Sequence, residues 1–378
     1  MRATLRTATR TLTGGGIILF ALGSALNAQL APVKMGPVPD EGNFFHATPP
    51  GWVQPKTPWG DPDLQGIWPI SYVGTVSFER CAPPFGPRKG PAPPCDPHQA
   101  FLTDAEYQAL LEKNAKQPDR YAEDAKEGQA GRAFLAGVMD TFTPQRQTSL
   151  IMDPPDGKLP EMTPEGKRLS AEMKSTWPLP GEKLVFNSYH DFDSWDQCIT
   201  RGLPASMFPF RYNNGLQIVQ SPGYVALRME MIHETRIVAL NAPPPSPNIH
   251  EWLGVSRGHW DGNTLVVATT NFKPGASATN TGVMGSPPGN RFPISEQMKM
   301  TERFTRVNND FLIYTITVED PVVLTHSWTA RFPLKLDNSY KLLEYACHED
   351  NQVIPDWISV SHAEEAKAKA AAEHKDQH

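Results

Sequence analysis

The stretch from Trp252 to Phe272, WLGVSRGHWDGNTLVVATTNF, constrains the fold more than any other part of the chain. Asp261-Gly262 offers the positive-φ turn at which two right-twisted strands can reverse direction. Thr264, Val266 and Val267 supply β-branched residues to the return strand. The stretch therefore predicts a β-hairpin. No phosphate-binding loop, nucleophile elbow or metal-ligand repeat accompanies it in the sequence.

Successive stretches after residue 210 share the composition of β-strands and are mostly separated by turn residues. They are Leu216–Gln220, Tyr224–Glu230, His233–Leu240, Trp252–Trp260, Thr264–Phe272, Met298–Val307, Phe311–Glu319, Leu324–Leu334 and Lys341–His348. Short connections between so many strands predict a mainly β fold, an antiparallel meander that closes into a barrel-like sheet, because closure removes exposed edges. The triplet Gly66-Ile67-Trp68 resembles the G-x-W of lipocalin-like barrels.

Proline shapes the expected organisation of the rest of the chain. The 38 prolines are concentrated before residue 100 and again around residues 243–247. Proline fixes φ and lacks a donor, so these segments are expected as ordered coil lying over the sheet. We therefore expect an irregular, Pro-rich segment over 29–212 that wraps the sheet, with short helices beginning near Thr103 and Thr163. A barrel-like domain over 213–350 and a polar, partly helical tail over 351–378 follow.

The N-terminus predicts export. Arg2, Arg6 and Arg10 precede a short apolar run over 14–22, and small residues offer a cleavage site near Gln29. We expect a cleavable signal peptide over 1–28 and a periplasmic or secreted mature chain without a membrane span. The formal net charge of −6 argues against a nucleic-acid partner. The sequence does not fix the oligomeric state.

Four cysteines allow three pairings. Cys81 and Cys95 enclose a short loop too rich in Pro and Gly to hold itself by helix or strand, so we pair them. Cys198 and Cys347 would then join the middle of the chain to its last predicted strand. A zinc-thiolate site is the alternative, but the spacing lacks a close C-x-x-C pair.

Strand periodicity selects candidate site residues. His326 and Trp328 are expected on one apolar face, and Tyr314 and Asp320 on the apolar face of a neighbouring strand. His233 is expected on the apolar face that continues from Val225 through Ile237, whereas Glu230 and Arg236 share the other face. We expect Glu230 and Arg236 to form an ion pair, either on the sheet surface or buried at a barrel mouth.

The favoured interpretation is a cofactor-independent lyase or isomerase that transfers protons on a small hydrophobic or aromatic substrate in an apolar pocket. His233 would be the base, Asp320 or Glu230 would orient it, and Tyr314 and Arg236 would stabilise developing negative charge. The predicted ligand-contacting residues are Trp252, His326, Trp328 and Asn271. We expect no cofactor and no metal, although His233, His326 and His348 could meet in a three-histidine site.

Two other classes stay open. A lipocalin-like carrier for a hydrophobic molecule would have an aromatic cavity and internally paired polar groups. A structural or protein-interaction module would use exposed sheet edges and the Pro-rich segments, and would have no enclosed pocket.

Several segments together resemble a large family of exported bacterial proteins of unknown function. They are CITRGLP at 198–204, QIVQSPG at 217–223, the run over 252–272, ERFTRV at 302–307 and EYACHE at 344–349. The resemblance covers about the last half of the chain and implies a secreted β-rich domain. The two cysteines that match Cys198 and Cys347 occur together in that family, and the resemblance implies no catalytic residues.

Overall fold

The computed structural model describes residues 47–82, 95–115, 143–177, 181–210, 212–274 and 291–375. The predicted signal peptide over 1–28 lies outside the described residues. The side chain of His233 also lies outside them, although its backbone is described.

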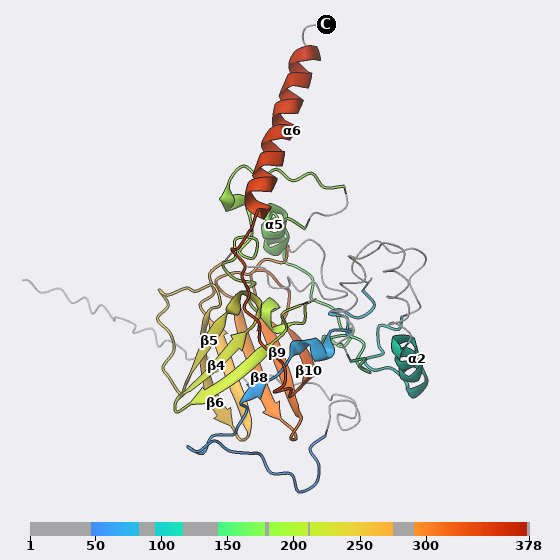
Figure 1. The fold of residues 1–378 in the computed structure, drawn as a ribbon, viewed down its shortest axis with the longest axis vertical. Helices are drawn as coiled ribbons and strands as arrows, with labels where there is room; N and C mark the ends of the chain where they lie inside the picture. Colours follow the sequence, from blue (N-terminus) through green and yellow to red (C-terminus); the bar gives the residue numbers. More distant parts are fainter. Residues whose placement is uncertain are drawn as a thin grey trace, which may run out of the picture. The chain divides into compact units, whose positions relative to one another are not determined.

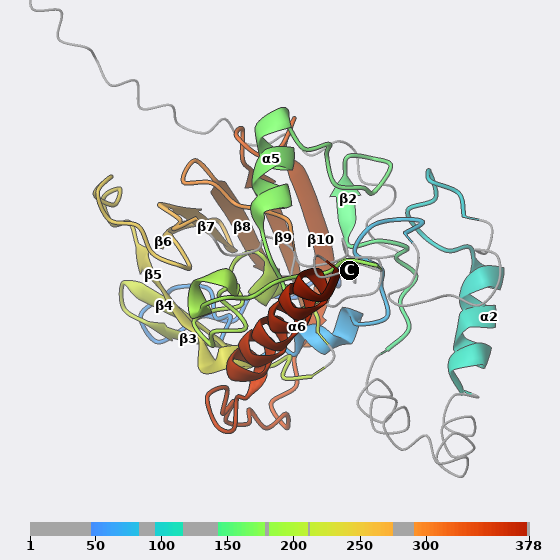
Figure 2. The same cartoon turned by 90° about the horizontal axis from the view of Figure 1, so that it is seen from above.

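The described chain forms a mainly β fold built on one sheet, which is curled into a half-barrel (Figure 1). The sheet has ten strands in the order β1-β3-β4-β5-β6-β7-β8-β9-β10-β2. Their bounds are β1 Gly66–Ile67, β2 Ile151–Asp153, β3 Leu216–Ser221, β4 Tyr224–Met229, β5 Thr235–Leu240, β6 Val255–Asp261, β7 Thr264–Thr270, β8 Lys299–Arg306, β9 Phe311–Glu319 and β10 Trp328–Lys335. Figure 2 shows the strands around an arc, with β2 beyond β10.

Two features of the predicted meander are confirmed closely. β9 spans the predicted residues, and the predicted hairpin joins β6 to β7 with Asp261 opposite Thr264. Gly262 takes φ +59° in that hairpin, the conformation for which glycine was expected. All strand pairs are antiparallel except β5 with β6, so the sheet is mixed.

The helices and most of the short 3₁₀ turns lie outside the meander, whereas η4 connects β4 to β5. These elements are α2 Asp104–Ala115, α5 Pro164–Glu172, α6 Val353–Lys375, η1 Ile70–Val73, η2 Tyr189–Asp191, η3 Ala205–Met207 and η4 Met231–His233. The predicted start of α5 is confirmed, because the Thr163 side chain accepts a hydrogen bond from Gly166 N at 2.9 Å. Pro164 occupies the first helical position, where its missing donor costs nothing.

One predicted strand face and two predicted strands differ from the structure. The η4 turn, with Ile232 at φ +57°, interrupts the apolar face that was predicted to continue from Val225 through Ile237. The last predicted strand over Lys341–His348 is coil. The strand predicted from Leu324 begins only at Trp328, since the preceding residues form a turn after β9.

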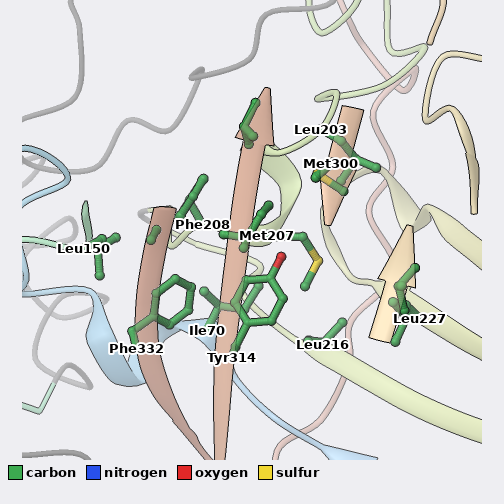
Figure 3. Packing of buried hydrophobic residues seen from close by; sticks show 14 of the residues in the cluster. Ile70, Leu150, Leu203, Met207, Phe208, Leu216, Leu227, Met300, Tyr314 and Phe332 are labelled. Atoms are coloured by element: carbon green, nitrogen blue, oxygen red, sulfur yellow. The ribbon is translucent and has the colours of Figure 1, made fainter. Parts of the chain in front are cut away.

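The hydrophobic core lies where segments outside the meander pack on the sheet. Leu203, Met207 and Phe208 come from the segment before β3, and they lie with Tyr314 and Phe332 in one buried cluster (Figure 3). The Phe208 and Phe332 ring centroids are 6.0 Å apart, and those of Tyr314 and Phe332 are 5.2 Å apart. The chain's own side chains therefore fill the space around Tyr314, where the sequence predicted an apolar pocket.

Both predicted disulfides are confirmed. Cys81 is bonded to Cys95 and Cys198 to Cys347, with Cα atoms 5.5 Å and 5.7 Å apart. Two disulfides are typical of an oxidising, extracytoplasmic location. Within the described ranges, no helix has the length and apolar character needed to cross a bilayer.

Candidate functional site

The sheet opens between β5 and β6. These parallel strands pair only through Ala239 opposite Arg257 and Leu240 opposite Gly258. The two strands approach each other closely at Gly258, where a Cβ would lie only 2.7 Å from Val238 Cγ1. The earlier residues of β5 pair with β4 alone, so one strand edge there is without a strand neighbour among the described residues.

A cleft of about 450 Å³, the β5–β6 cleft, lies at this opening. More than half of its lining residues are apolar or glycine. The lining residues are Thr235, Arg236, Ile237, Ala239, Pro245, Ser246, Ile249, Glu251, Leu253, Gly254, Val255, Ser256 and Arg257. Ile237 is 55% exposed and Ile249 is 51% exposed, so apolar surface remains in contact with water beside the cleft. The volume lies within the range of small-molecule sites in proteins.

One wall of the cleft is the Pro-rich segment over 241–254, which we call the cleft loop. Asn271 Nδ2 donates hydrogen bonds to Ser246 O and Ile249 O, both at 2.8 Å. Arg257 Nε donates to Pro243 O at 2.9 Å. Asn271, predicted as a ligand contact, therefore holds the cleft loop in place through its side chain.

Arg236 links the cleft to the core. Its Nη2 donates to Glu302 Oε1 and Oε2 at 3.0 Å and 2.8 Å, and the Tyr314 hydroxyl donates to Oε1 at 2.7 Å. The side chains of Arg236 and Glu302 are 2% and 0% exposed. A buried ion pair of this kind fixes the position of the guanidinium, because separating the charges would leave one of them unpaired.

Arg236 also carries donors without partners. Within the part of the chain that the structure describes, Nε and Nη1 are buried and make no hydrogen bond. The nearby hydroxyls of Ser256 and Thr269 bond to each other at 3.0 Å. Buried donors are normally paired, so two free donors on one guanidinium are unusual.

Tyr314 can act only as a donor in this cluster. Burial, and then the adjacent Glu302 carboxylate, raise the pKa of Tyr314 well above its usual value. The phenol therefore stays protonated at neutral pH and holds Glu302 in place. The cluster can position the Arg236 guanidinium, but Tyr314 does not provide a base.

The predicted ion pair between Glu230 and Arg236 is wrong, since Arg236 pairs with Glu302. The η4 turn shifts the strand phase, so Arg236 is buried and Ile237 is exposed, the reverse of the prediction. The Glu230 carboxylate instead accepts hydrogen bonds from four donors around the start of β3. They are Asn213 Nδ2, Gly215 N, Tyr340 OH and Leu343 N, at 2.7 to 3.1 Å.

Asp320 is also held by internal donors. Its carboxylate accepts hydrogen bonds from Ser295 N and Oγ, both at 2.7 Å, and from Val322 N and Val323 N at 3.2 Å. These contacts organise the turn after β9. The carboxylate thus has the turn-forming arrangement that its place before Pro321 also allowed.

Asp320, His326 and Asn271 line a second cleft of about 760 Å³, the rim cleft, at the ends of β7 and β9. The predicted apolar placement of His326 is wrong, because the residue is exposed in the turn before β10. Its Nδ1 lies 2.9 Å from Ser327 O. Glu296, Lys299 and Glu319 also line this cleft, which gives it a charged character.

The remaining predicted residues lie apart. Trp328 is fully buried against Phe78 and Phe208, with ring centroids 5.7 Å and 6.0 Å apart. Trp252 is half-buried, and Lys273 Nζ lies 4.5 Å from its ring centroid. No group of three potential metal ligands occurs among the described side chains.

Glu302 is the functional candidate that the sequence prediction missed. Its alternation with Met300 and Phe304 places a carboxylate on an apolar strand face, which is a signal for a buried, paired charge. The identity of its partner depends on a contact across 66 residues. The sequence alone contains no periodicity that links those two positions.

Comparison with known proteins gives no match, since no family model, curated protein or solved structure corresponds significantly to the chain. The resemblance to exported proteins of unknown function stays a prediction.

Proposed function

We propose that the protein is an exported binding protein that holds a small hydrophobic molecule in the β5–β6 cleft. Export is supported by the signal peptide predicted over 1–28 and by the two disulfides, which are typical of an oxidising, extracytoplasmic location. The observation that carries the binding proposal is an apolar cleft of about 450 Å³ flanked by the exposed side chains of Ile237 and Ile249. Covering such surface is favourable by about 25 cal/mol per Å².

The state of the polar groups favours binding over proton-transfer catalysis. Glu230 and Asp320 each accept several internal hydrogen bonds. Tyr314 is protonated and buried. In a binding protein the carboxylates and the phenol can all be paired internally, whereas an acid–base enzyme needs a titratable group that faces its substrate.

An acid–base enzyme is the second candidate, and the rim cleft is the observation that favours it. There the exposed His326 imidazole shares a cavity with Glu296 and Glu319. An imidazole can act as a general acid or base, and a nearby carboxylate can orient it. In this candidate His326 replaces His233 as the base.

A thermal-shift screen of the mature chain against small aromatic and aliphatic compounds tests the proposal, because a ligand of the native state raises the melting temperature. Mass spectrometry of each stabilising mixture should recover the compound unchanged. Ile249→Asp should abolish the shift, because it places a charge on the cleft wall. The matched control is Val360→Asp, on exposed α6 at 54% exposure. Consumption of the compound would instead establish an enzyme, and absence of any shift would overturn the binding proposal.

A further inference from the structure

We propose that the ligand of the β5–β6 cleft carries an uncharged carbonyl oxygen, which accepts hydrogen bonds from Arg236. This inference rests on the proposed function and specifies the class of ligand. It derives from Arg236, a residue of the cleft lining whose buried guanidinium has two donors without partners among the described residues.

The internal partners of Arg236 are too few for its donors. An arginine side chain has five N–H groups in a fixed planar arrangement and no acceptor. Glu302 contacts Nη2 alone. Nε and Nη1 make no hydrogen bond to the described part of the protein, and both atoms are buried. An acceptor that reaches them would relieve this deficit.

The acceptors described below, from residues near Arg236, already accept hydrogen bonds from other donors. The Ser256 and Thr269 hydroxyls bond to each other, and Ser256 O accepts from Arg257 Nη1 at 3.0 Å. Glu234, which follows η4 directly, accepts from Arg201 N at 3.0 Å and Ser206 Oγ at 3.0 Å. The most direct source of a further oxygen is therefore a molecule that enters the cleft.

The guanidinium cannot turn away to find solvent. Glu302 is fully buried and is itself held by the Tyr314 hydroxyl. Rotation of Arg236 would break a buried ion pair, which is strongly unfavourable. The donor positions are thus fixed before a ligand arrives, and fixed donors increase affinity because little order is lost on binding.

The charges around the cleft favour a carbonyl over a carboxylate as the acceptor group of the ligand. Glu302 already neutralises Arg236, and Glu251 adds a second negative charge to the cleft lining. Arg257, the other cation of the lining, is bound to Pro243 O and Ser256 O. An anionic ligand would meet an ion pair that is already neutral and the negative charge of Glu251, so an uncharged acceptor is favoured. Ile237, Ile249 and Leu253 suit a compact apolar body behind the carbonyl.

Acetophenone and ethylbenzene form the test pair, because they differ mainly by a carbonyl oxygen, and benzoate adds the charge. Titration calorimetry on the full mature chain should give at least about tenfold tighter binding of acetophenone than of ethylbenzene, a ratio typical of one buried hydrogen bond to a charged group. Benzoate should bind more weakly than acetophenone. The paired variant Arg236→Met with Glu302→Gln should reduce the acetophenone preference to about one. The matched pair Arg303→Met with Asp261→Asn, which removes an exposed ion pair that does not line the cleft, should keep it.

A second measurement needs no variant. Addition of acetophenone to ¹⁵N-labelled protein should shift the Arg236 Nε–H resonance, and ethylbenzene should not. Equal affinities for the two compounds would overturn the carbonyl inference and leave the binding proposal intact. Tightest binding of benzoate would overturn the uncharged class. Failure of all three compounds to bind would overturn this inference together with the proposed binding of small aromatic molecules.

Discussion

The β8–β9 and β5–β6 strand pairs show two ways in which one sheet can be built. β8 and β9 pair through eight consecutive positions, from Lys299 opposite Glu319 to Arg306 opposite Leu312. β5 and β6 pair through two positions only. A short turn holds antiparallel neighbours together along their length, whereas parallel neighbours need a long crossover that leaves their first residues free to separate.

The two regions are coupled by one ion pair. Glu302 belongs to the continuous β8–β9 region, and its partner Arg236 belongs to the open β5–β6 region. Within the described structure, no buried side-chain donor of β8 or β9 lacks a partner, while the open region retains Nε and Nη1 of Arg236 and Nε1 of Trp260 without one. The proposed binding site lies where the sheet changes from hairpin connections to a crossover.

Removal of the Glu302 carboxylate should have the largest effect on stability. Glu302→Ala leaves Arg236 as an uncompensated buried charge, and we expect a loss of about 3–5 kcal/mol in the free energy of unfolding. Urea denaturation followed by tryptophan fluorescence measures this change. The control is Asp261→Ala, which breaks the exposed Arg303 ion pair and should cost less than about 1 kcal/mol.

Equal losses in the free energy of unfolding for Glu302→Ala and Asp261→Ala would show that the buried Arg236–Glu302 ion pair stabilises the fold no more than an exposed ion pair does. The paired change Arg236→Met with Glu302→Leu should restore most of the loss, because replacing both charges leaves no buried charge unpaired. A double variant as unstable as Glu302→Ala would contradict that explanation.

The pH dependence of stability should differ between two carboxylates of the segment before β3. Burial and then the Asp193 carboxylate raise the pKa of Asp196 to about 7. The Asp196 carboxyl accepts a hydrogen bond from Thr176 Oγ1 at 2.7 Å. Because the folded-state pKa exceeds the usual value of 3.8, the folded chain holds this proton more tightly than the unfolded chain.

Its stabilising contribution is complete below about pH 4 and falls as pH rises towards 7, by at most about 1.4 kcal/mol per pH unit. Asp196→Asn should remove this dependence, so the stability difference between wild type and variant should change between pH 4 and pH 7. Asp191→Asn is the control, because Lys174 lowers the pKa of Asp191 and its dependence has the opposite sign. Parallel pH profiles for wild type and Asp196→Asn would reject the assignment.

The strands joined by short turns were predictable from the sequence, whereas the opening between β5 and β6 was not. β9 and the β6–β7 hairpin follow from local alternation and from the turn chemistry of Asp261-Gly262. The phase of β5 depends on Ile232 at φ +57°, a backbone conformation that an isoleucine side chain does not announce. One shifted residue moves every later side chain to the opposite face.

The candidate site shows the same limit. Arg236, Tyr314 and Asn271 were identified by residue type, but their roles depend on contacts between distant segments. Glu302 partners the first two, and Asn271 binds the loop over 241–254. Such contacts form only when the sheet curls, so alternation within one strand cannot reveal them.

The hydrogen bonds from Asn271 to the cleft loop should contribute less to the free energy of unfolding than the Arg236–Glu302 ion pair does. Asn271→Ala removes two hydrogen bonds to loop carbonyls, and we expect a loss of about 1–2 kcal/mol in stability. Faster amide hydrogen exchange over 246–251, with unchanged exchange in β8 and β9, would show that the effect is local. Asn271→Gly is the control for the backbone, since it also allows the positive φ of 59° at this position. If Asn271→Gly keeps the loop protected, the side-chain hydrogen bonds are not what holds it.

Ile237 should have the smallest effect on stability and a clear effect on binding. Its side chain is 55% exposed, so Ile237→Ser should change the free energy of unfolding by no more than about 0.5 kcal/mol. The same change removes apolar surface from the cleft wall, and a loss of about 1 kcal/mol in binding would weaken acetophenone affinity roughly fivefold. Val219→Ser is the matched control, because Val219 is 44% exposed on β3 and does not line the cleft. Similar loss of affinity in both variants would place the ligand on the wider exposed face of β3 to β5, and an unchanged affinity in Ile237→Ser would remove the β5–β6 opening as the binding site.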